Sequence, residues 1–221
     1  MSRVSPESSP QIAIAIMAKA PIAGLAKTRL IPHLGADGAA ALQRWLLERT
    51  VRTALASGLG PVTLWCAPDT EHPVFVALAK SGEITLRQQP DGDLGRRMRQ
   101  AVEDSSGTAG TVLIGTDCPL LTSADLRAAG KALATHDAVV APAEDGGYVL
   151  IGLRRAIPEV FANIDWSTDR VMAQTRQRLT GNASSWFEFS PFWDVDRSTD
   201  FERLLPLFPE LQNCIQRREI A

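Results

Sequence analysis

Short apolar runs alternate with helical patterns along the whole 221-residue chain. The first run, Ile12 to Met17, is rich in isoleucine and gives way abruptly to a polar, basic stretch. A run of this length suits a buried strand and is too short to span a membrane. Strands that alternate with helices predict a mainly parallel sheet covered by helices on both faces. We therefore expect an α/β fold.

The other elements are expected at regular intervals. Further strands are predicted at 62–67, 84–88, 111–115, 138–142, 148–153 and 186–189. Helices are predicted from Asp37 to about Ser57, over 74–80 and after the loop 89–97. A further helix is expected from Thr122, where Asp125 makes a near capping box. The last two are expected from Ser167 or Thr168 to Leu179 and from Ser198 onward. No internal repeat or low-complexity linker interrupts them, which predicts a single domain over residues 11–221. Residues 1–10, rich in Ser and Pro, are expected to be a disordered tail.

Composition limits the classes of partner. With 45% apolar and 22% charged residues the chain is typical of globular proteins, and its net charge of -2 gives no reason to expect nucleic acid. Cys66, Cys118 and Cys214 are widely spaced and odd in number, which favours a reducing compartment. The first apolar run leads directly into Lys19, a poor match to a signal peptide. We expect a cytoplasmic protein without a membrane partner.

The loop after the first strand has the composition of an anion site. It contains Lys19, Lys27 and Arg29, with Gly24 between them and Thr28 beside the last two. Lysine offers a point charge, arginine a bidentate fork, and glycine allows close approach of the backbone. A solvated basic loop is the alternative. Because ligands of open α/β sheets bind beyond the carboxyl ends of strands, we favour phosphate binding.

The same loop lacks the two commonest phosphate-binding motifs. A Walker A sequence needs glycine directly before its lysine and six residues before it, where this chain has Ala26 and Pro21. The dinucleotide motif GxGxxG is also missing from the loop. An ATP-hydrolysing switch is therefore disfavoured.

Carboxylates follow two of the predicted strands. Asp117 comes three residues after the apolar run Val112 to Ile114, so it is delivered to the same sheet edge as the basic loop. Asp194 and Asp196 are two apart in extended chain and point the same way. Because Mg²⁺ takes one or two carboxylates plus phosphate oxygens, these residues are candidate metal ligands. In the alternative, Asp117 forms a turn, and Asp196 or Ser198 caps the last helix.

Two glycine-containing loops are more ambiguous. Asp145, Gly146 and Gly147 lie between two strand-like runs, where acid and glycines are also typical of a hairpin turn. In the functional interpretation the glycines admit a ligand that Asp145 faces. Asp93 could bond a ribose or base and Arg96 a phosphate, or both could be ordinary residues of a helix start.

Five motifs carry a resemblance to a known family. In chain order they are KAPIAGLAKTRL, QPDGDLGRRM, VLIGTDCPLL, PAEDGGYVLIGL and WDVDRSTDFERL. Together they resemble the CofC-like bacterial glycosyltransferase-like family (DUF2064 type), related to phospholactate guanylyltransferase, over about residues 12–205. This family is similar to the nucleotide-diphospho-sugar transferase superfamily. The resemblance implies a three-layer GT-A-like α/β fold with a mainly parallel central sheet.

The resemblance, taken together with the loop residues described above, gives a set of expected site residues. The metal, Mg²⁺ or Mn²⁺, is expected on Asp117 and Asp196, the acceptor at Asp145, Gly146 and Gly147, and catalytic roles on Lys27, Arg29 and Asp145. The nucleotide is expected at Lys19, Gly24, Lys27, Thr28, Arg29, Gln89, Gly92, Asp93 and Arg96. The basic loop departs from the superfamily by having fewer glycines than its usual opening.

The implied activity is transfer from a nucleotide donor to a small-molecule acceptor. Nucleotidyl transfer from an NTP to a phosphorylated molecule needs charge neutralisation more than a base, which the three loop cations suit. Glycosyl transfer from an NDP-sugar to a hydroxyl benefits from a carboxylate base, for which Asp145 is the candidate. We favour nucleotidyl transfer slightly. A nucleotide-sensing module without turnover is the non-enzymatic alternative.

Overall fold

The computed structural model describes residues 11–105 and 109–212, and the expected tail at 1–10 lies outside them. The strands are β1 (Ile12–Lys19), β2 (Val62–Ala67), β3 (Ile84–Gln88), β4 (Gly110–Ile114), β5 (Ala138–Pro142), β6 (Tyr148–Leu153) and β7 (Trp186–Glu188). The helices are α1 (Ile31–Ser57), α2 (Pro73–Ala79), α3 (Leu94–Glu103), α4 (Ser123–Leu133), α5 (Val171–Gly181) and α6 (Ser198–Leu204), with short 3-10 helices η1 (Thr28–Leu30) and η2 (Pro158–Phe161).

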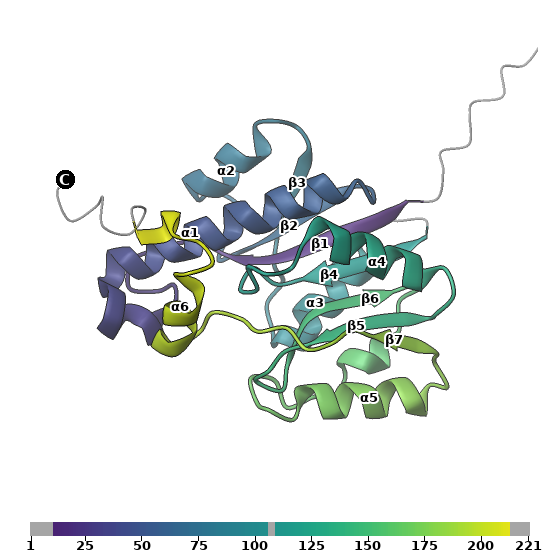
Figure 1. The fold of residues 1–221 in the computed structure, drawn as a ribbon. Helices are drawn as coiled ribbons and strands as arrows, with labels where there is room; N and C mark the ends of the chain where they lie inside the picture. Colours follow the sequence, from purple (N-terminus) through teal and green to yellow (C-terminus); the bar gives the residue numbers. More distant parts are fainter. Residues whose placement is uncertain (1–10, 106–108, 213–221) are drawn as a thin grey trace, which may run out of the picture.

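These strands form one seven-stranded sheet in the order β3-β2-β1-β4-β6-β5-β7 (Figure 1). β6 runs antiparallel to both β4 and β5, while the remaining neighbours are parallel. β1 lies near the centre, with Ile14 opposite Val62 on one side and Val112 on the other. The expected α/β fold with a mainly parallel sheet is confirmed.

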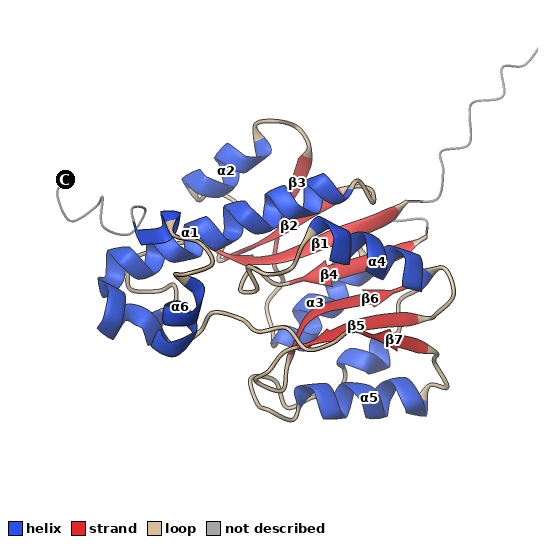
Figure 2. Cartoon of the chain, in the orientation of Figure 1, coloured by secondary structure: helices blue, strands red, loops and turns tan. Residues whose placement is uncertain are grey.

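Helices cover both faces of the sheet and make three layers (Figure 2). Alternation along β1 sends Ile14 and Ile16 into a core shared with α1, α2 and α4, while Ala15 joins the opposite core with α3, η2 and α5. Both isoleucines are almost completely buried, worth about 1.5–3 kcal/mol each relative to exposure. A third cluster packs α6 against the first half of α1. The sheet therefore holds the carboxyl ends of β1 and β4 in fixed register.

Three helix starts differ from the sequence expectation. α3 begins at Leu94, inside the loop expected at 89–97, because Asp93 caps it there. α1 begins at Ile31, not Asp37, and continues across Gly35, whose φ of 69° and ψ of 169° are not helical. α5 begins at Val171, because Ser167 adopts a left-handed φ of 64° and the Thr168 hydroxyl donates to the carbonyl of Asp165.

Candidate functional site

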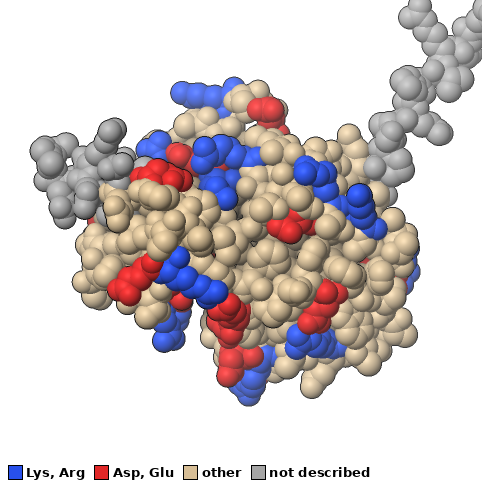
Figure 3. Space-filling model, in the orientation of Figure 1, with Lys and Arg blue, Asp and Glu red and all other residues tan. Residues whose placement is uncertain are grey.

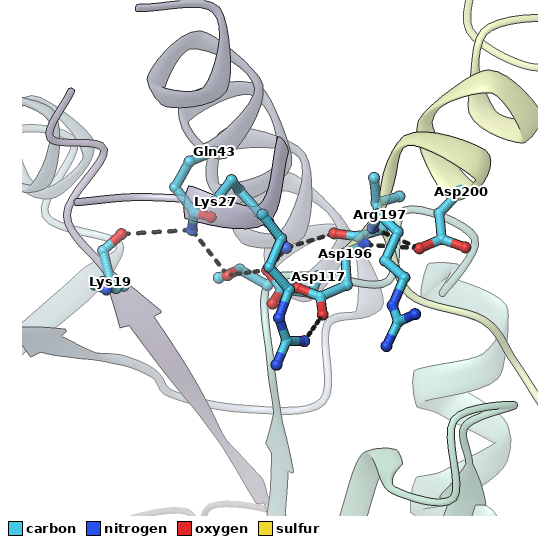
Figure 4. Close-up of polar contacts among 10 residues, drawn as sticks. Lys19, Lys27, Gln43, Asp117, Asp196, Arg197 and Asp200 are labelled. Atoms are coloured by element: carbon cyan, nitrogen blue, oxygen red, sulfur yellow. Dashed lines mark hydrogen bonds and ion pairs between the residues drawn. The ribbon is translucent and has the colours of Figure 1, made fainter. Parts of the chain in front are cut away.

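Lys27 connects the basic loop to the rest of the sheet edge. Its Nζ lies 2.6 Å from the carbonyl oxygen of Val195 and 2.8 Å from Oδ1 of Asp117. Only 4% of the Lys27 side chain is exposed, whereas 46% of the Asp117 side chain is. Figure 4 shows this contact network between the loop after β1, the end of β4 and the segment before α6. The ammonium group is therefore turned into the protein, not toward solvent.

A buried glutamine links the same region to α1. The Gln43 side-chain amide donates to the hydroxyl of Thr116 at 3.2 Å and lies 3.5 Å from the carbonyl oxygen of Lys19 (Figure 4). It thereby joins the ends of β1 and β4. Our sequence interpretation missed Gln43, although a polar residue among buried apolar neighbours such as Leu42 and Leu46 was an available signal.

Asp196 forms an ion pair with Arg29 of the basic loop. Its backbone N–H and that of Arg197 both donate to the carboxylate of Asp200, at 3.0 and 2.7 Å. Asp200 therefore serves the start of α6, and the alternative in which Asp196 or Ser198 caps this helix is not what the structure has. The Asp196 side chain is 40% exposed and that of Arg29 is 65% exposed.

Asp194 is the most electrostatically perturbed acid of this region. Burial, and after it the nearby charges of Asp145 and Asp117, together raise its pKa to about 6. The segments that carry these acids are held together by backbone bonds, from Glu144 N–H to the Phe192 carbonyl and from Val195 N–H to the Asp117 carbonyl, both 2.9 Å. The charges of acids on two other segments thus act on Asp194.

Replacing Asp194 by asparagine should stabilise the metal-free protein. A raised folded-state pKa means that folding stability falls as pH rises from about 4 to about 6, with the full loss above that window. We expect Asp194→Asn to gain about 1–2 kcal/mol at pH 8, allowing for solvent screening, and almost nothing at pH 4. Urea unfolding in EDTA at both pH values measures this, with the exposed Asp91→Asn as control. A variant less stable than wild type at pH 8 would contradict it.

The loop at Asp145 to Gly147 is anchored on the chain before α5. The carboxylate of Asp145 accepts the Gly147 N–H at 2.9 Å, the hydrogen bond of a turn. Gly146 has a φ of 90°, and a Cβ there would sit 2.2 Å from the carbonyl oxygen of Asp169. Its own carbonyl accepts the Met172 N–H at 2.8 Å. Gly146 therefore admits a neighbouring backbone, and the turn interpretation of Asp145 applies to one carboxylate oxygen.

The loop at 89–97 joins β1, β2 and α3. The Gln89 amide donates to the carbonyls of Ala18 and Trp65, at 3.0 and 2.8 Å. Asp93 caps α3 by accepting the Arg96 N–H at 2.8 Å, so its carboxylate acts in the helix-start role. The Arg96 side chain packs over Gly92, where a Cβ would meet its Cδ at 2.7 Å.

The remaining residues of the basic loop stabilise its bend. Lys19 donates to the carbonyl of Leu25 at 2.8 Å while staying exposed, and Gly24 adopts a left-handed φ of 81°. Thr28 opens η1 directly after Lys27. The segments at 18–30, 89–97, 116–119, 144–147 and 193–197 thus all lie at the carboxyl edge of the sheet, connected by the contacts above.

The described residues show neither a concentration of one charge on the drawn face (Figure 3) nor a ready cluster of metal ligands. On the face drawn in Figure 3, basic and acidic side chains are intermixed without an extended patch of one sign. Residues 11–105 and 109–212 hold no ready group of three or more His, Cys, Asp or Glu side chains that could bind a metal. Across the same residues, none of the helices combines the length and apolar character that a membrane span requires.

Comparison with solved structures gives the same fold. A protein of Desulfovibrio desulfuricans G20, provisionally named a nucleotide-diphospho-sugar transferase, is 28% identical, with a TM-score of 0.79 over 93% of this chain and 96% of its own. Rv0371c of Mycobacterium tuberculosis H37Rv in complex with manganese is 18% identical, with a TM-score of 0.56 over 89% and 99%. The 2-C-methyl-D-erythritol 4-phosphate cytidylyltransferase of Thermus thermophilus is 15% identical, with a TM-score of 0.58 over 89% and 98%. No curated protein matches the chain.

The fold and the likeness to the Desulfovibrio protein place the chain in the nucleotide-diphospho-sugar transferase class. Within that class the chain belongs to the family DUF2064, described as uncharacterized protein conserved in bacteria, whose model matches residues 50–168. The matched range contains Asp117 and the loop at 144–147. The family resemblance and the GT-A-like fold expected from the sequence are confirmed.

Proposed function

We propose that this protein is a divalent-metal-dependent transferase that moves a nucleotidyl group from an NTP to a small-molecule acceptor. One observation carries the proposal: Lys27 joins the basic loop, Asp117 and the segment at Val195 through contacts of 2.6 and 2.8 Å. Cations for phosphate and carboxylates for a metal are thereby gathered at one sheet edge, where ligands of open α/β sheets bind.

The donor set fits a hard divalent cation. Asp117 and Asp196 are both partly exposed, and each is neutralised by a cation of the basic loop. Mg²⁺ or Mn²⁺ held by these carboxylates, with Asp194 close by, would neutralise the charge of the donor phosphates. Arg29, which is largely exposed, would then pass from Asp196 to a phosphate oxygen, and Lys19 lies on the same loop. Two carboxylates without phosphate bind Mg²⁺ weakly, so nucleotide and metal should bind together.

A second candidate, glycosyl transfer from an NDP-sugar to a hydroxyl, is favoured by the acids on the acceptor side. Asp145 and Asp194 come from adjacent segments, and neither has an ion-pair partner among the described residues. Such carboxylates suit the activation of a hydroxyl. They would repel a phosphorylated acceptor, so nucleotidyl transfer to a phosphate requires the divalent ion to offset them.

A ligand screen separates the two candidates. We expect NTPs with Mg²⁺ or Mn²⁺ to raise the melting temperature, and EDTA to abolish most of the shift, because binding the folded state stabilises it by mass action. Release of pyrophosphate with an acceptor would establish nucleotidyl transfer and exclude a module that only senses nucleotides. Stabilisation by UDP- or GDP-sugars and by no NTP, together with inactivity of Asp145→Asn, would instead select glycosyl transfer.

A further inference from the structure

We infer that Lys27 is a positioning residue that holds Asp117 against the segment at 193–197, and that it is not a phosphate ligand. The inference rests on the proposed function, because Asp117 and this segment are proposed to carry the metal. It gives Lys27 a role different from that of Lys19 and Arg29, although the sequence alone presents the three residues as equivalent cations.

The contacts of Lys27 form a closed ring. Its ammonium donates to the carbonyl of Val195 and pairs with the carboxylate of Asp117, while the Val195 N–H donates to the Asp117 carbonyl at 2.9 Å. With 4% of it exposed, the Lys27 side chain has almost no surface to offer a phosphate. Arg29, by contrast, is 65% exposed.

The backbone conformation at Lys27 accompanies the inward direction of its side chain. Lys27 adopts a left-handed conformation, φ 47° and ψ 45°, which costs a non-glycine residue about 1–2 kcal/mol. Ala26 and Leu30 on either side are fully buried, and the Lys27 carbonyl accepts the Leu30 N–H at 2.8 Å. Such a conformation persists where the surroundings over-determine it, as these neighbours do.

Lys27 contacts the Oδ1 oxygen of the Asp117 carboxylate, which leaves the second oxygen for another ligand. The ammonium contacts Oδ1, and the Thr116 hydroxyl also donates to Oδ1, at 3.3 Å. In the described part of the chain both of these contacts fall on the same oxygen, while the side chain remains 46% exposed. A carboxylate held in this way is preorganised to bind a cation through its second oxygen.

Two variants with opposite expected effects test the inference. In Lys27→Met we expect Mn²⁺ affinity, measured with Mn²⁺ alone by electron paramagnetic resonance, to fall about tenfold, as is usual for residues that orient a ligand. Its affinity for inorganic pyrophosphate in EDTA, measured by calorimetry, should stay within about twofold, since the buried ammonium does not reach the anion. Arg29→Met should show the reverse, losing about tenfold in pyrophosphate affinity and keeping that for Mn²⁺.

The controls make each outcome decisive. Both variants are measured well below their melting temperatures, and Lys27→Gln, which keeps a donor for the Val195 carbonyl, replaces Lys27→Met if that variant does not fold. Unchanged or tighter Mn²⁺ binding, or loss of pyrophosphate binding equal to that of Arg29→Met, would overturn the positioning role. If wild type binds neither Mn²⁺ nor pyrophosphate even when the two are supplied together, the proposed function itself fails, and the role of Lys27 with it.

Discussion

Replacing Asp117 by asparagine is expected to lower the free energy of unfolding by about 3 kcal/mol, although the Asp117 side chain is nearly half exposed. The reason lies with its partner. The Lys27 side chain is 4% exposed, and its ammonium would lose its counter-charge while keeping the carbonyl of Val195 as an acceptor. Removing one partner of a buried pair is strongly destabilising because it leaves an uncompensated charge in the protein. Asp117→Asn should therefore be a stability variant as well as a metal-site variant.

A double-mutant cycle identifies the cause. Lys27→Met alone should cost about 1–2 kcal/mol, since it removes the charge and leaves the Val195 carbonyl without this donor. The double variant should be more stable than Asp117→Asn alone, because the orphan charge is gone. Urea unfolding in EDTA measures all four proteins. The exposed pair of Arg29 and Asp196 is the matched control, with a coupling below about 1 kcal/mol. If Asp117→Asn unfolds within about 0.5 kcal/mol of wild type, the burial of Lys27 does not persist in solution.

The strands could be placed from sequence because their signals are local. The bounds expected for 62–67, 84–88, 138–142 and 148–153 are those of β2, β3, β5 and β6. Each is a short β-rich run bounded by turn residues, which is a local signal of a strand. The capping box of Thr122 and Asp125 was equally local and is present.

The start of α5 could not be placed, because it depends on contacts that the sequence does not contain. Ser167 and Thr168 are good capping types, but the chain first forms a left-handed turn at Ser167. The Thr168 hydroxyl donates to the Asp165 carbonyl and accepts the Arg170 N–H at 3.3 Å, one residue before the helix begins. Gly146 occupies the adjoining space against Asp169. Tertiary packing here overrides the local preference for a cap.

The sequence predicted which residues belong to the candidate site but not which of them form pairs. The strand pattern predicted that the basic loop and Asp117 lie at one edge of the sheet, and the structure has them there. Composition presented Lys27 and Arg29 as equivalent cations, whereas the structure buries the first and exposes the second. Lys27 and Asp117 are far apart in the sequence, so no spacing rule could select that pair. The same holds for Asp194, whose raised pKa arises from burial and from charges on other segments.

Gly146→Ala is expected to destabilise the protein by about 3–4 kcal/mol. A methyl group at this position would lie 2.2 Å from the Asp169 carbonyl oxygen and 2.6 Å from its Cα, both of them backbone atoms that cannot rotate away. The φ of 90° adds strain for any L-residue. If Gly146 instead admitted a ligand, alanine would weaken acceptor binding and leave the free energy of unfolding nearly unchanged.

Two other glycines separate the contributions to this effect. Gly24 has a φ of 81°, but a Cβ added there would have no atom within 4 Å, so Gly24→Ala reports backbone strain without a clash, about 1–2 kcal/mol. At Gly147 a Cβ would meet the Asp145 carboxylate at 3.2 Å, a contact that a side chain can relieve. Urea unfolding should therefore rank Gly146→Ala as clearly the least stable of the three. Equal losses for Gly146→Ala and Gly24→Ala would mean that the chain at Asp169 yields, and that the loop carrying Asp145 is free to open toward an acceptor.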